Sequence, residues 1–555
     1  MPLPHLNICL VHGRPELAAR WRDQGHAVRH LTPEGTIVDL GAELAAQGFR
    51  PDLVVQVERL GPRTLLRGLD ALDCRKVFWS VDTHLNLHWH GYYSRLFDLT
   101  CTTQHGWVPR LGREGAPRAA WLPWFGERRP FRPHAARARD VGFVGRVSEH
   151  RPARAWLMAF LKERCGLAPV QGLGRAALLA YYDDTRLVPN ESILGEVNFR
   201  LFEAASCGCA VLNPDSGEDP GELFEPGREV VLVRDVLELR WELDRLLADR
   251  AAAESLGLAA WERVRRSHLA EHRADRLLEL AADLPAGAAR GPAARAAFAM
   301  TLLAAWEGDM LPLHYPQVLE LVHGLPDEPE AQALALRVLI FAGARREVEA
   351  RLDALAAVLP REPGRVEDPR LAAAASLAAL RLERWDLAKA FWYGHARAGG
   401  LPGPEKPEGP VALHRIWARE LARAGRRRRG GFLFREGEHL PCTALECLVG
   451  ALQLDPEDQE TTRRLAAMTT GMAGAEPSRL AFLSDMALRA PRDWRRALEL
   501  GLANLEVWRL REGLADLIQA RDLARDAGEA DRFQRLLTAR DRRGLAAAAL
   551  TAAGA

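Results

Sequence analysis

Short runs of apolar and β-branched residues alternate with longer amphipathic stretches through the first part of the chain. The runs predict strands at residues 7–11, 53–57, 77–81 and 99–102, and the stretches predict helices at residues 15–24 and 63–72. The alternation returns further on, with strands predicted at residues 141–144, 210–213 and 229–233 and helices at residues 153–164, 199–206 and 236–248. Strands that alternate with helices form parallel sheets covered on both faces. The sequence therefore predicts two doubly wound, Rossmann-like α/β domains, with a ligand at the carboxyl ends of the strands in the cleft between them.

The second part of the chain shows helical periodicity and no convincing strand pattern. Two segments share one spacing of small or apolar residues that ends in a proline. Val348, Leu352 and Leu355 precede Pro360, and Ala444, Leu448 and Leu452, with Ala451 at the matching third position, precede Pro456. A helical hairpin buries its apolar face against the next hairpin, and the second segment resembles the end of a tetratricopeptide repeat. We expect an all-α helical-repeat domain after the two α/β domains.

Composition places the boundaries between these domains. An Arg- and Pro-rich stretch at residues 127–139 separates the two predicted sheets, and the segment LPAGAARGPAA at residues 284–294 has the composition of a linker. We expect domains at residues 1–138 and 139–284, a linker at residues 285–294 and the helical-repeat domain at residues 295–555.

Charge, hydropathy and cysteine usage exclude several classes of protein. The 75 basic and 74 acidic residues nearly cancel, which argues against a dedicated nucleic-acid-binding protein. Apolar runs are too short for a transmembrane helix, and the run at residues 8–11 is too short for the core of a signal peptide. The eight cysteines lack the spacing of a disulfide framework or a zinc knuckle. We expect a cytoplasmic protein.

The segment EVNFRLFEAASCGCAV at residues 196–211 carries the most informative chemistry. Asn198 stands where it can cap the predicted helix, and Arg200 and Glu203 are three apart and share a helix face. The N-terminus of a helix has free N–H groups and a partial positive charge, which suit a phosphate. A carboxylate one turn further on, at Glu203, could hold the ribose hydroxyls of a nucleotide. The block predicts nucleotide binding.

In its order of motifs, this block resembles the nucleotide-sugar half of GT-B glycosyltransferases, of the group-1 (retaining) kind and in particular the spore-maturation type. The resemblance covers roughly residues 50–285. It rests on the strand and glycine turn VGFVGR at 141–146, the segment LFEPGREVVLV at 223–233, and matching residues of one motif: Asn198, Arg200, Phe202, Glu203, Ala204, Cys207 and Gly208. His268 and Arg273 fall where a helix of that family ends the domain.

The resemblance implies transfer of a sugar from a UDP- or GDP-type nucleotide-sugar to an acceptor hydroxyl on a protein or a surface glycan. It implies retention of configuration and no metal or other cofactor. Glu203 would bind the ribose and Glu196 would approach the sugar as a catalytic residue, although the two carboxylates are seven apart here and eight apart in the better-known pattern. Arg146, with Arg151 or Arg200 as an alternative, would neutralise the diphosphate. Gly145 and Asn198 complete the implied donor site.

The segment FWSVDTHLNLHWHGYY at residues 78–93 is the densest polar and aromatic stretch of the first domain. It begins at the end of a predicted strand, where a catalytic loop would lie. We expect Asp82 and His84 to face the cleft as catalytic residues that touch the sugar or the acceptor. Two alternatives remain: a loop whose histidines only satisfy backbone groups, and a zinc site formed by His84, His88 and His90.

Other features leave rival interpretations open. The segment GLGRAA at residues 172–177 is interpreted as a turn into a helix, with NAD binding as the alternative. The basic run at residues 426–429 predicts a solvated surface loop, with an acidic partner or a membrane surface as the alternative. The helical repeats favour a protein partner or acceptor. The rival function is a repeat scaffold with a non-catalytic glycosyltransferase-like half.

Overall fold

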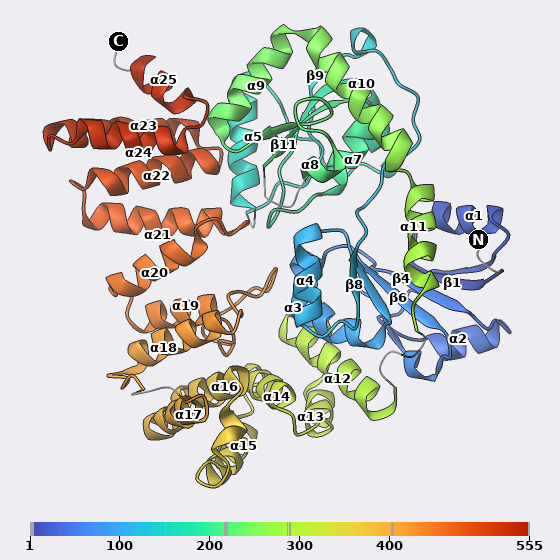
Figure 1. Ribbon diagram of the computed structural model, residues 1–555, viewed down its shortest axis with the longest axis vertical. Helices are drawn as coiled ribbons and strands as arrows, with labels where there is room; N and C mark the ends of the chain where they lie inside the picture. The colour runs from blue at the N-terminus through green and yellow to red at the C-terminus, as the bar shows by residue number, and fades with distance from the viewer. Residues whose placement is uncertain are drawn as a thin grey trace. The chain divides into compact units, whose positions relative to one another are not determined.

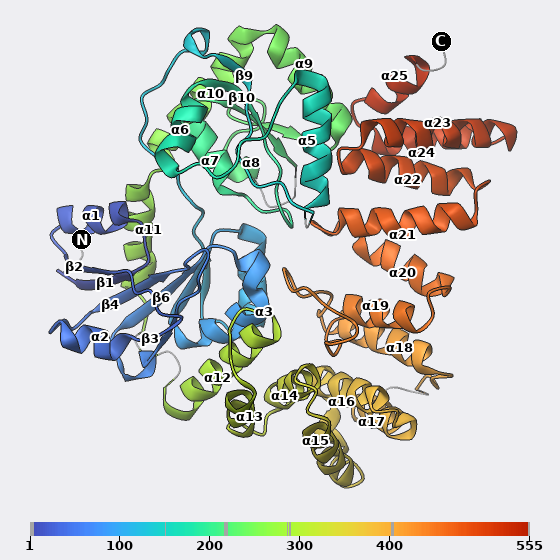
Figure 2. The ribbon, with the colours of Figure 1, turned by 180° about the vertical axis from the view of Figure 1, so that it is seen from behind.

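The computed structural model describes residues 5–149, 151–215, 220–285, 287, 290–400 and 404–552, and its ribbon is drawn in Figures 1 and 2. The chain forms two compact units, each made from two separate stretches of sequence. The first contains Met1–Leu122 and Leu277–Leu465, and the second contains Pro123–Arg276 and Ala466–Ala555. Each unit therefore combines one part of the α/β region with its own part of the helical region. The predicted domain boundaries stay a prediction.

The first unit is built on a six-stranded sheet in which every recorded strand pair is parallel. Its order is β2-β1-β4-β6-β7-β8, and β3 pairs separately with β5. The strands are β1 (Asn7–Val11), β2 (Ala27–Leu31), β3 (Ile37–Asp39), β4 (Leu53–Val57), β5 (Leu65–Arg67), β6 (Arg75–Ser80), β7 (Leu99–Thr102) and β8 (Ala119–Trp121). Strand β4 is buried along its whole length, because a parallel sheet is covered by helices on both faces and its central strands are apolar throughout.

The helices of the first unit come from both of the sequence stretches that form it. Those of the α/β part are α1 (Pro15–Asp23), α2 (Leu40–Ala46), α3 (Thr83–Tyr93) and α4 (Val108–Arg113). Those of the helical part are α12 (Gly291–Glu307), α13 (Tyr315–His323), α14 (Pro329–Phe341), α15 (Arg345–Val358), α16 (Pro369–Arg381), α17 (Trp385–Ala398), α18 (Pro410–Arg423) and α19 (Ala444–Leu454). Helix α12 packs directly against α3, so the two parts share an interface.

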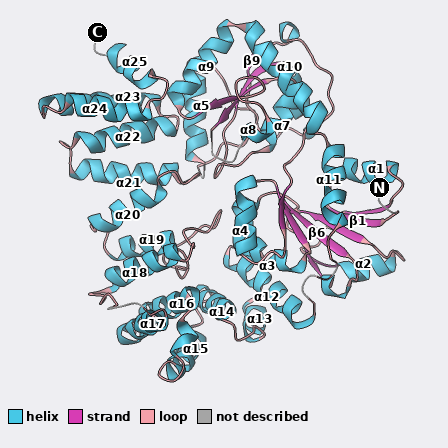
Figure 3. Ribbon diagram, viewed as in Figure 1, coloured by secondary structure: helices cyan, strands magenta, loops and turns pink. Residues whose placement is uncertain are grey.

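The second unit has a four-stranded parallel sheet in the order β12-β11-β10-β9. Its strands are β9 (Arg139–Val141), β10 (Thr185–Pro189), β11 (Ala210–Pro214) and β12 (Val231–Val233). The helices around it are α5 (Pro152–Cys165), α6 (Arg175–Asp183), α7 (Phe199–Ser206), α8 (Pro220–Leu223), α9 (Val236–Ala248) and α10 (Arg250–Ser267). Figure 3 shows these strands with helices on either side.

The core of the second unit continues from the sheet into the last helices of the chain. These are α21 (Glu476–Arg489), α22 (Trp494–Glu506), α23 (Leu510–Asp526), α24 (Ala530–Arg540) and α25 (Leu545–Ala552). One hydrophobic cluster contains Phe143, Leu187 and Leu212 together with Trp494 and Leu517. Helices α11 (Ala270–Ala282) and α20 (Gln459–Thr469) each span a boundary between the two units. The last helices are therefore part of the second unit's core.

The predicted fold class is confirmed: two parallel, Rossmann-like sheets are followed by an all-helical region. Within residues 290–400 and 404–552 the structure has no strand. Helices α15 and α19 carry the two segments with the shared spacing and end at Val358 and Leu454, just before their prolines. The assignment of these helices to a repeat family stays a prediction. In the part of the chain that the structure describes, none of the helices combines the length and the apolar character that crossing a bilayer requires.

Three local predictions are wrong, and one helix begins inside the predicted linker. Residues 63–72 do not form a helix: Leu65–Arg67 is strand β5 and Leu69–Ala71 is a short 3₁₀ turn, because Gly68 takes the left-handed conformation at φ 76° and breaks any helix there. Residues 78–93 are not a loop after a strand, since Thr83 begins helix α3. Strand β9 ends at Val141, where the prediction placed its start. Helix α12 begins at Gly291, inside the predicted linker, whose residues 286, 288 and 289 lie outside the described residues.

Candidate functional site

The predicted donor residues of the second unit gather at the carboxyl ends of β9 and β10. The segment after β9 carries Gly145, Arg146 and Arg151, and the loop at residues 190–198 after β10 carries Glu196 and leads through Asn198 into α7. In open α/β sheets, ligands bind outside the carboxyl ends of the strands. The fold thus brings these residues to the edge where a ligand site is expected.

Arg200 lies at this edge and donates three hydrogen bonds to other residues of the protein. Its Nε donates to the carbonyl oxygen of Val144 at 3.1 Å, and its Nη1 donates to Asn190 Oδ1 at 2.6 Å. The guanidinium lies 4.2 Å from the centre of the Phe143 ring. Burial lowers the pKa of Arg200. A Cβ atom at position 145 would lie 2.6 Å from Arg200 Nη2, so Gly145 makes room for this arginine.

Asn198 occupies the N-cap position of α7 without capping the helix through its side chain. Its Nδ2 instead donates to the carbonyl oxygen of Glu191 at 2.8 Å. Asn198 therefore stands at the predicted N-cap position, but the predicted capping hydrogen bond from its side chain is absent. Asn198 stabilises the loop that carries Glu196, and it leaves the first N–H groups of α7 without this side chain as acceptor.

Arg146 and Arg151 differ from Arg200 in the bonds that their guanidinium groups make with the described residues. Neither guanidinium makes a hydrogen bond or ion pair with any residue that the structure describes. Arg146 is exposed and Arg151 is half-buried. Burial and the neighbouring Arg154 lower the pKa of Arg151. Two cations without partners at the carboxyl edge of a sheet suit an anionic ligand such as a diphosphate.

Arg154 and Glu191 form a buried ion pair beside these cations that the sequence analysis missed. Arg154 Nη2 lies 2.5 Å from Glu191 Oε2, and the two side chains are 4% and 6% exposed. Arg154 also donates to the carbonyl oxygen of Arg146 at 3.1 Å. The pair ties α5 to the loop after β10. The sequence signal was an arginine on the buried face of a predicted amphipathic helix.

Glu203 is held by an arginine that was also missed. Its carboxylate accepts a hydrogen bond from Arg175 Nη1 at 2.8 Å. Burial raises the pKa of Glu203, and Arg175 opposes that shift. Arg175 also pairs with Glu127. It is the first residue of α6, which follows the turn at Gly172, so the interpretation of residues 172–177 as a turn into a helix is confirmed.

Glu196 lies in a tightly turned part of the loop at residues 190–198. Its N–H donates to the carbonyl oxygen of Ile193 at 3.0 Å, and between the two, Leu194 and Gly195 have φ angles of 52° and 75°. A leucine in the left-handed region is strained and persists only where its surroundings hold it. The chain therefore holds Glu196 on a constrained turn.

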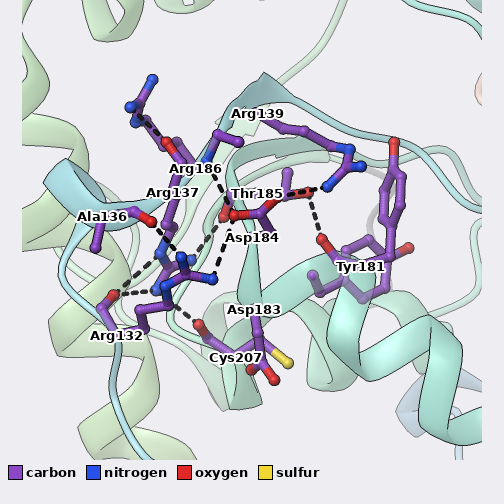
Figure 4. A network of polar contacts seen from close by, with 12 residues as sticks. Arg132, Ala136, Arg137, Arg139, Tyr181, Asp183, Asp184, Thr185, Arg186 and Cys207 are labelled. Atoms are coloured by element: carbon purple, nitrogen blue, oxygen red, sulfur yellow. Dashed lines mark hydrogen bonds and ion pairs between the residues drawn. The ribbon is translucent and has the colours of Figure 1, made fainter.

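Helix α7 is anchored at its other end by a network of arginines, of which Arg137 and Arg186 are buried and Arg139 is exposed (Figure 4). Arg137 donates to the carbonyl oxygens of Thr185 at 2.6 Å and Cys207 at 2.8 Å. Arg186 donates to the carbonyl oxygen of Arg137 at 2.6 Å, and Arg139 pairs with Asp184 at 2.7 Å. These bonds join the segment before β9, the start of β10 and the end of α7. The network fixes the helix that bears Arg200 and Glu203.

His268 and Arg273, which the resemblance placed at the end of the domain, are buried structural residues. Arg273 donates to the carbonyl oxygens of Pro123 at 2.7 Å and Trp124 at 2.9 Å, and to His268 Nδ1 at 2.8 Å. The other ring nitrogen of His268 lies 2.9 Å from the carbonyl oxygen of Leu223. Burial and Arg273 lower the pKa of His268 to about 3. The pair connects the start of the second unit to the segment that joins α10 and α11.

In the first unit, Asp82 and His84 lie at the start of α3. Glu58, at the end of β4, accepts hydrogen bonds at 2.7 Å from the N–H groups of both Val81 and Asp82. Burial alone would raise the pKa of Glu58, but it is lowered because His90 and these N–H groups stabilise the carboxylate. Asp82 is the N-cap residue of α3, and His84 is buried in its first turn. Glu58, which the sequence analysis missed, therefore fixes this helix start.

Two of the three histidines proposed for zinc, His88 and His90, have different surroundings. The Nδ1 atom of His90 lies 2.8 Å from Ser80 Oγ, and its Nε2 atom lies 3.3 Å from Glu58 Oε1. The ring of His88 packs edge-on against Phe432, with 5.2 Å between ring centres. Burial lowers the pKa of His88 to about 3. His88 and His90 thus serve separate packing and hydrogen-bonding roles.

The prediction of a solvated surface loop at residues 426–429 is wrong for Arg429. Its Nε lies 2.6 Å from Glu446 Oε1, and both side chains are 6% exposed. Buried charges are tolerated where they are paired, and this arginine also lies 3.2 Å from Glu307. The basic run therefore contributes a buried ion pair to the helical region.

Comparison with known protein families gives a match to the α/β part of the second unit. Residues 134–279 match a family model described as glycosyl transferase-like. No curated protein sequence matches the chain.

Several solved structures overlap about half of the chain. A sucrose-phosphate synthase from Thermosynechococcus elongatus is 14% identical with a TM-score of 0.38, and the match covers 49% of this chain and 98% of that one. HepE from Anabaena, in complex with UDP-glucose, is 14% identical with a TM-score of 0.37, covering 50% and 100%. A glycosyltransferase from Rickettsia africae is 11% identical with a TM-score of 0.39, covering 50% and 98%.

Proposed function

We propose that this protein is a glycosyltransferase that moves a sugar from a UDP- or GDP-type nucleotide-sugar to an acceptor hydroxyl. The observation that carries the proposal is the family match over residues 134–279, which includes every residue expected to bind the donor. Within that segment, Arg146 and Arg151 present guanidinium groups that pair with no described residue. A diphosphate is the ligand that this charge and this place in the fold suit best.

The chain's own residues supply the chemistry of the proposed reaction. As the bond to the sugar breaks, negative charge develops on the departing nucleotide, and fixed cations stabilise that charge. Arg146 and Arg151 take this role, so no metal ion is needed. Glu203 binds the ribose, and Glu196, Asp82 and His84 act on the sugar or the acceptor. Retention of anomeric configuration belongs to this proposal.

We assign the acceptor to a protein or a surface glycan, and a protein acceptor would contact the helical region. Helical arrays present extended surfaces that commonly bind polypeptides. A cytoplasmic location fits the eight free cysteines, seven of which are buried, because thiols persist in reducing compartments.

The experiment is turnover of a panel of UDP- and GDP-sugars, measured as release of the nucleoside diphosphate with and without a chelator. We expect one donor to be consumed, with the chelator having no effect. Glu203→Gln keeps the shape of the side chain and removes its charge, and we expect it to lower turnover by about tenfold or more, which corresponds to the loss of one hydrogen bond to a charged group. If no donor is consumed under any condition, the enzyme proposal is wrong.

A second candidate is a helical-repeat scaffold whose glycosyltransferase-like half binds a nucleotide without turnover. Two observations favour it. Arg175 already engages the carboxylate of Glu203 at 2.8 Å, and three carbonyl or amide oxygens accept hydrogen bonds from Arg200. Binding of a nucleoside diphosphate by a chain that consumes no donor would identify this function.

A further inference from the structure

A loop of the helical region lies against the first turns of α3 in the first unit. This loop, residues 424–443 between α18 and α19, contains two consecutive glycines. A Cβ atom on Gly430 would lie 2.5 Å from the carbonyl oxygen of His84 and 2.7 Å from the Trp107 ring. A Cβ atom on Gly431, whose φ is 66°, would lie 2.2 Å from the carbonyl oxygen of Leu85. Only glycine allows this approach of backbone to backbone.

The loop is closed at its base and anchored next to the glycines. Ala444 N donates to the carbonyl oxygen of Arg426 at 2.9 Å, and Leu445 N donates to that of Arg427 at 3.0 Å. Arg429 is bound to Glu446 at 2.6 Å. Its guanidinium lies 3.4 Å from the centre of the Phe432 ring. The residues on both sides of Gly430–Gly431 are therefore held in place.

The anchor continues into the helices under the loop. Glu307 on α12 receives hydrogen bonds from Arg337 on α14 at 2.9 and 3.1 Å, with both side chains almost fully buried. The ring of His439 stacks on Phe341 with 4.8 Å between centres. Removing one member of a buried ion network strands the other charges, which strongly destabilises the arrangement. The loop is thus fixed by buried contacts to the helices of the first unit.

We propose that residues 429–431 hold the first turns of α3, and with them Asp82 and His84, in the position that the transfer reaction needs. The helical region is then a positioning element of the catalytic half as well as an acceptor surface. The effect on turnover rests on the proposed function, whereas the effect on α3 does not.

The test compares Gly431→Ala with Gly437→Ala in the full chain. Gly437 lies in the same loop, its φ is not positive, and a Cβ atom there meets no atom within 4 Å. Amide hydrogen exchange across residues 83–90 should become about tenfold faster or more in Gly431→Ala, which corresponds to about 1.4 kcal/mol of local opening free energy. Exchange in Gly437→Ala should equal that of the wild type.

A milder change keeps the test decisive if Gly431→Ala does not fold. Phe432→Leu removes the ring that contacts His88 and Arg429, and it should speed exchange at residues 86–90 by a smaller factor. Where a donor is consumed, Gly431→Ala should lower kcat and leave the dissociation constant of the nucleoside diphosphate unchanged. Exchange of α3 that is the same in all these variants overturns the positioning role. A wild type that consumes no donor overturns only the proposed function.

Discussion

Arginine has two uses in this protein, and its partners distinguish them. Arg137, Arg200 and Arg273 are buried and donate to backbone carbonyl oxygens. Arg146 and Arg151 bind no described residue through their guanidinium groups. A buried guanidinium satisfies several carbonyl groups at once because its donors are fixed in one plane. The first kind builds the second unit, and the second kind is available to a ligand.

The same substitution at two of these arginines should therefore have different effects. Arg200→Lys loses the planar donors that reach Val144, Asn190 and Glu191 and should destabilise the chain by about 2 kcal/mol. Arg151→Lys removes no such bond and should change stability by less than about 0.5 kcal/mol. Urea unfolding followed by tryptophan fluorescence measures both. Equal losses would show that Arg151 has a structural role too.

His268 predicts a pH dependence of stability. Its pKa is about 3 in the folded protein, against an ordinary value of 6.5 for histidine, so the unfolded chain takes up a proton first as the pH falls. The neutral ring makes its full contribution to the free energy of unfolding above pH 6.5. This contribution is lost progressively toward pH 3, at about 1.4 kcal/mol for each pH unit.

We expect His268→Gln, which cannot titrate, to be less stable than the wild type at about pH 7.5. The difference in stability between the two proteins should become smaller as the pH falls toward about 4. Thermal unfolding of both proteins at several pH values measures it, and the same substitution at the exposed His323 is the control. A gap that stays constant with pH would contradict the assignment of a buried neutral ring.

At the scale of elements, the loop at residues 190–198 depends on a glycine of the helical region. Gly474 has a φ of 80°, and a Cβ atom there would lie 2.7 Å from Leu194 Cα. Gly471 has a φ of 65° in the same turn but meets nothing within 4 Å. The two glycines share one backbone requirement and differ in contact with the loop that carries Glu196.

Gly474→Ala should therefore disturb the loop at residues 190–198, whereas Gly471→Ala should cost only the strain of its backbone, about 1 kcal/mol. Hydrogen exchange of residues 191–197 is the measurement. Faster exchange in Gly474→Ala alone supports the contact with the loop. If both variants change the exchange equally, backbone strain and not the contact accounts for the effect.

The elements predicted best are those with one dominant local signal. Residues 7–11, 53–57, 199–206 and 236–248 match strands and helices to the residue, because their apolar periodicity agrees with the burial they reach in the fold. The helix predicted at 63–72 failed where strand β5 pairs with β3, a partner distant enough in sequence to leave no local pattern. The start of α3 was missed because the segment just before it is held by a distant residue: the N–H groups of Val81 and Asp82 donate to Glu58, which follows β4.

The roles predicted for the site residues stay predictions, but the structure shows which of these residues have partners within the protein. The sequence placed Arg146, Arg151 and Arg200 in one region, but it could not tell which guanidinium would find carbonyl partners. Arg175 and Glu191 were missed because each is defined by a partner far away in the sequence, Glu203 and Arg154. Long-range pairs of this kind become visible only in three dimensions.

For the whole molecule, the helical region is shared between the two compact units. In the second unit, Trp494, Leu517 and Leu537 belong to the same buried cluster as Phe143 and Leu212. A fragment of residues 1–285 would expose the apolar surface that these helices cover, and exposed surface of this kind promotes association.

We therefore expect the fragment of residues 1–285 to unfold at a lower temperature than the full chain and to bind a hydrophobic dye. Calorimetry and dye fluorescence measure this, with the full chain as the reference. Cooperative unfolding of the fragment at the temperature of the full chain would show that the α/β half is independent of the last helices.

The central claim is that the second unit binds the diphosphate of a nucleotide-sugar through cations that have no protein partner among the described residues. Titration calorimetry with UDP and GDP tests it most directly, on the wild type, Arg151→Ala and Arg228→Ala. Arg228 is an exposed arginine of the same unit that pairs with Glu225 at 3.2 Å. We predict that one nucleotide binds the wild type and Arg228→Ala alike and binds Arg151→Ala about tenfold or more weakly, the loss of one charge-assisted hydrogen bond. Binding of neither nucleotide, or equal affinity in all three proteins, would contradict the claim.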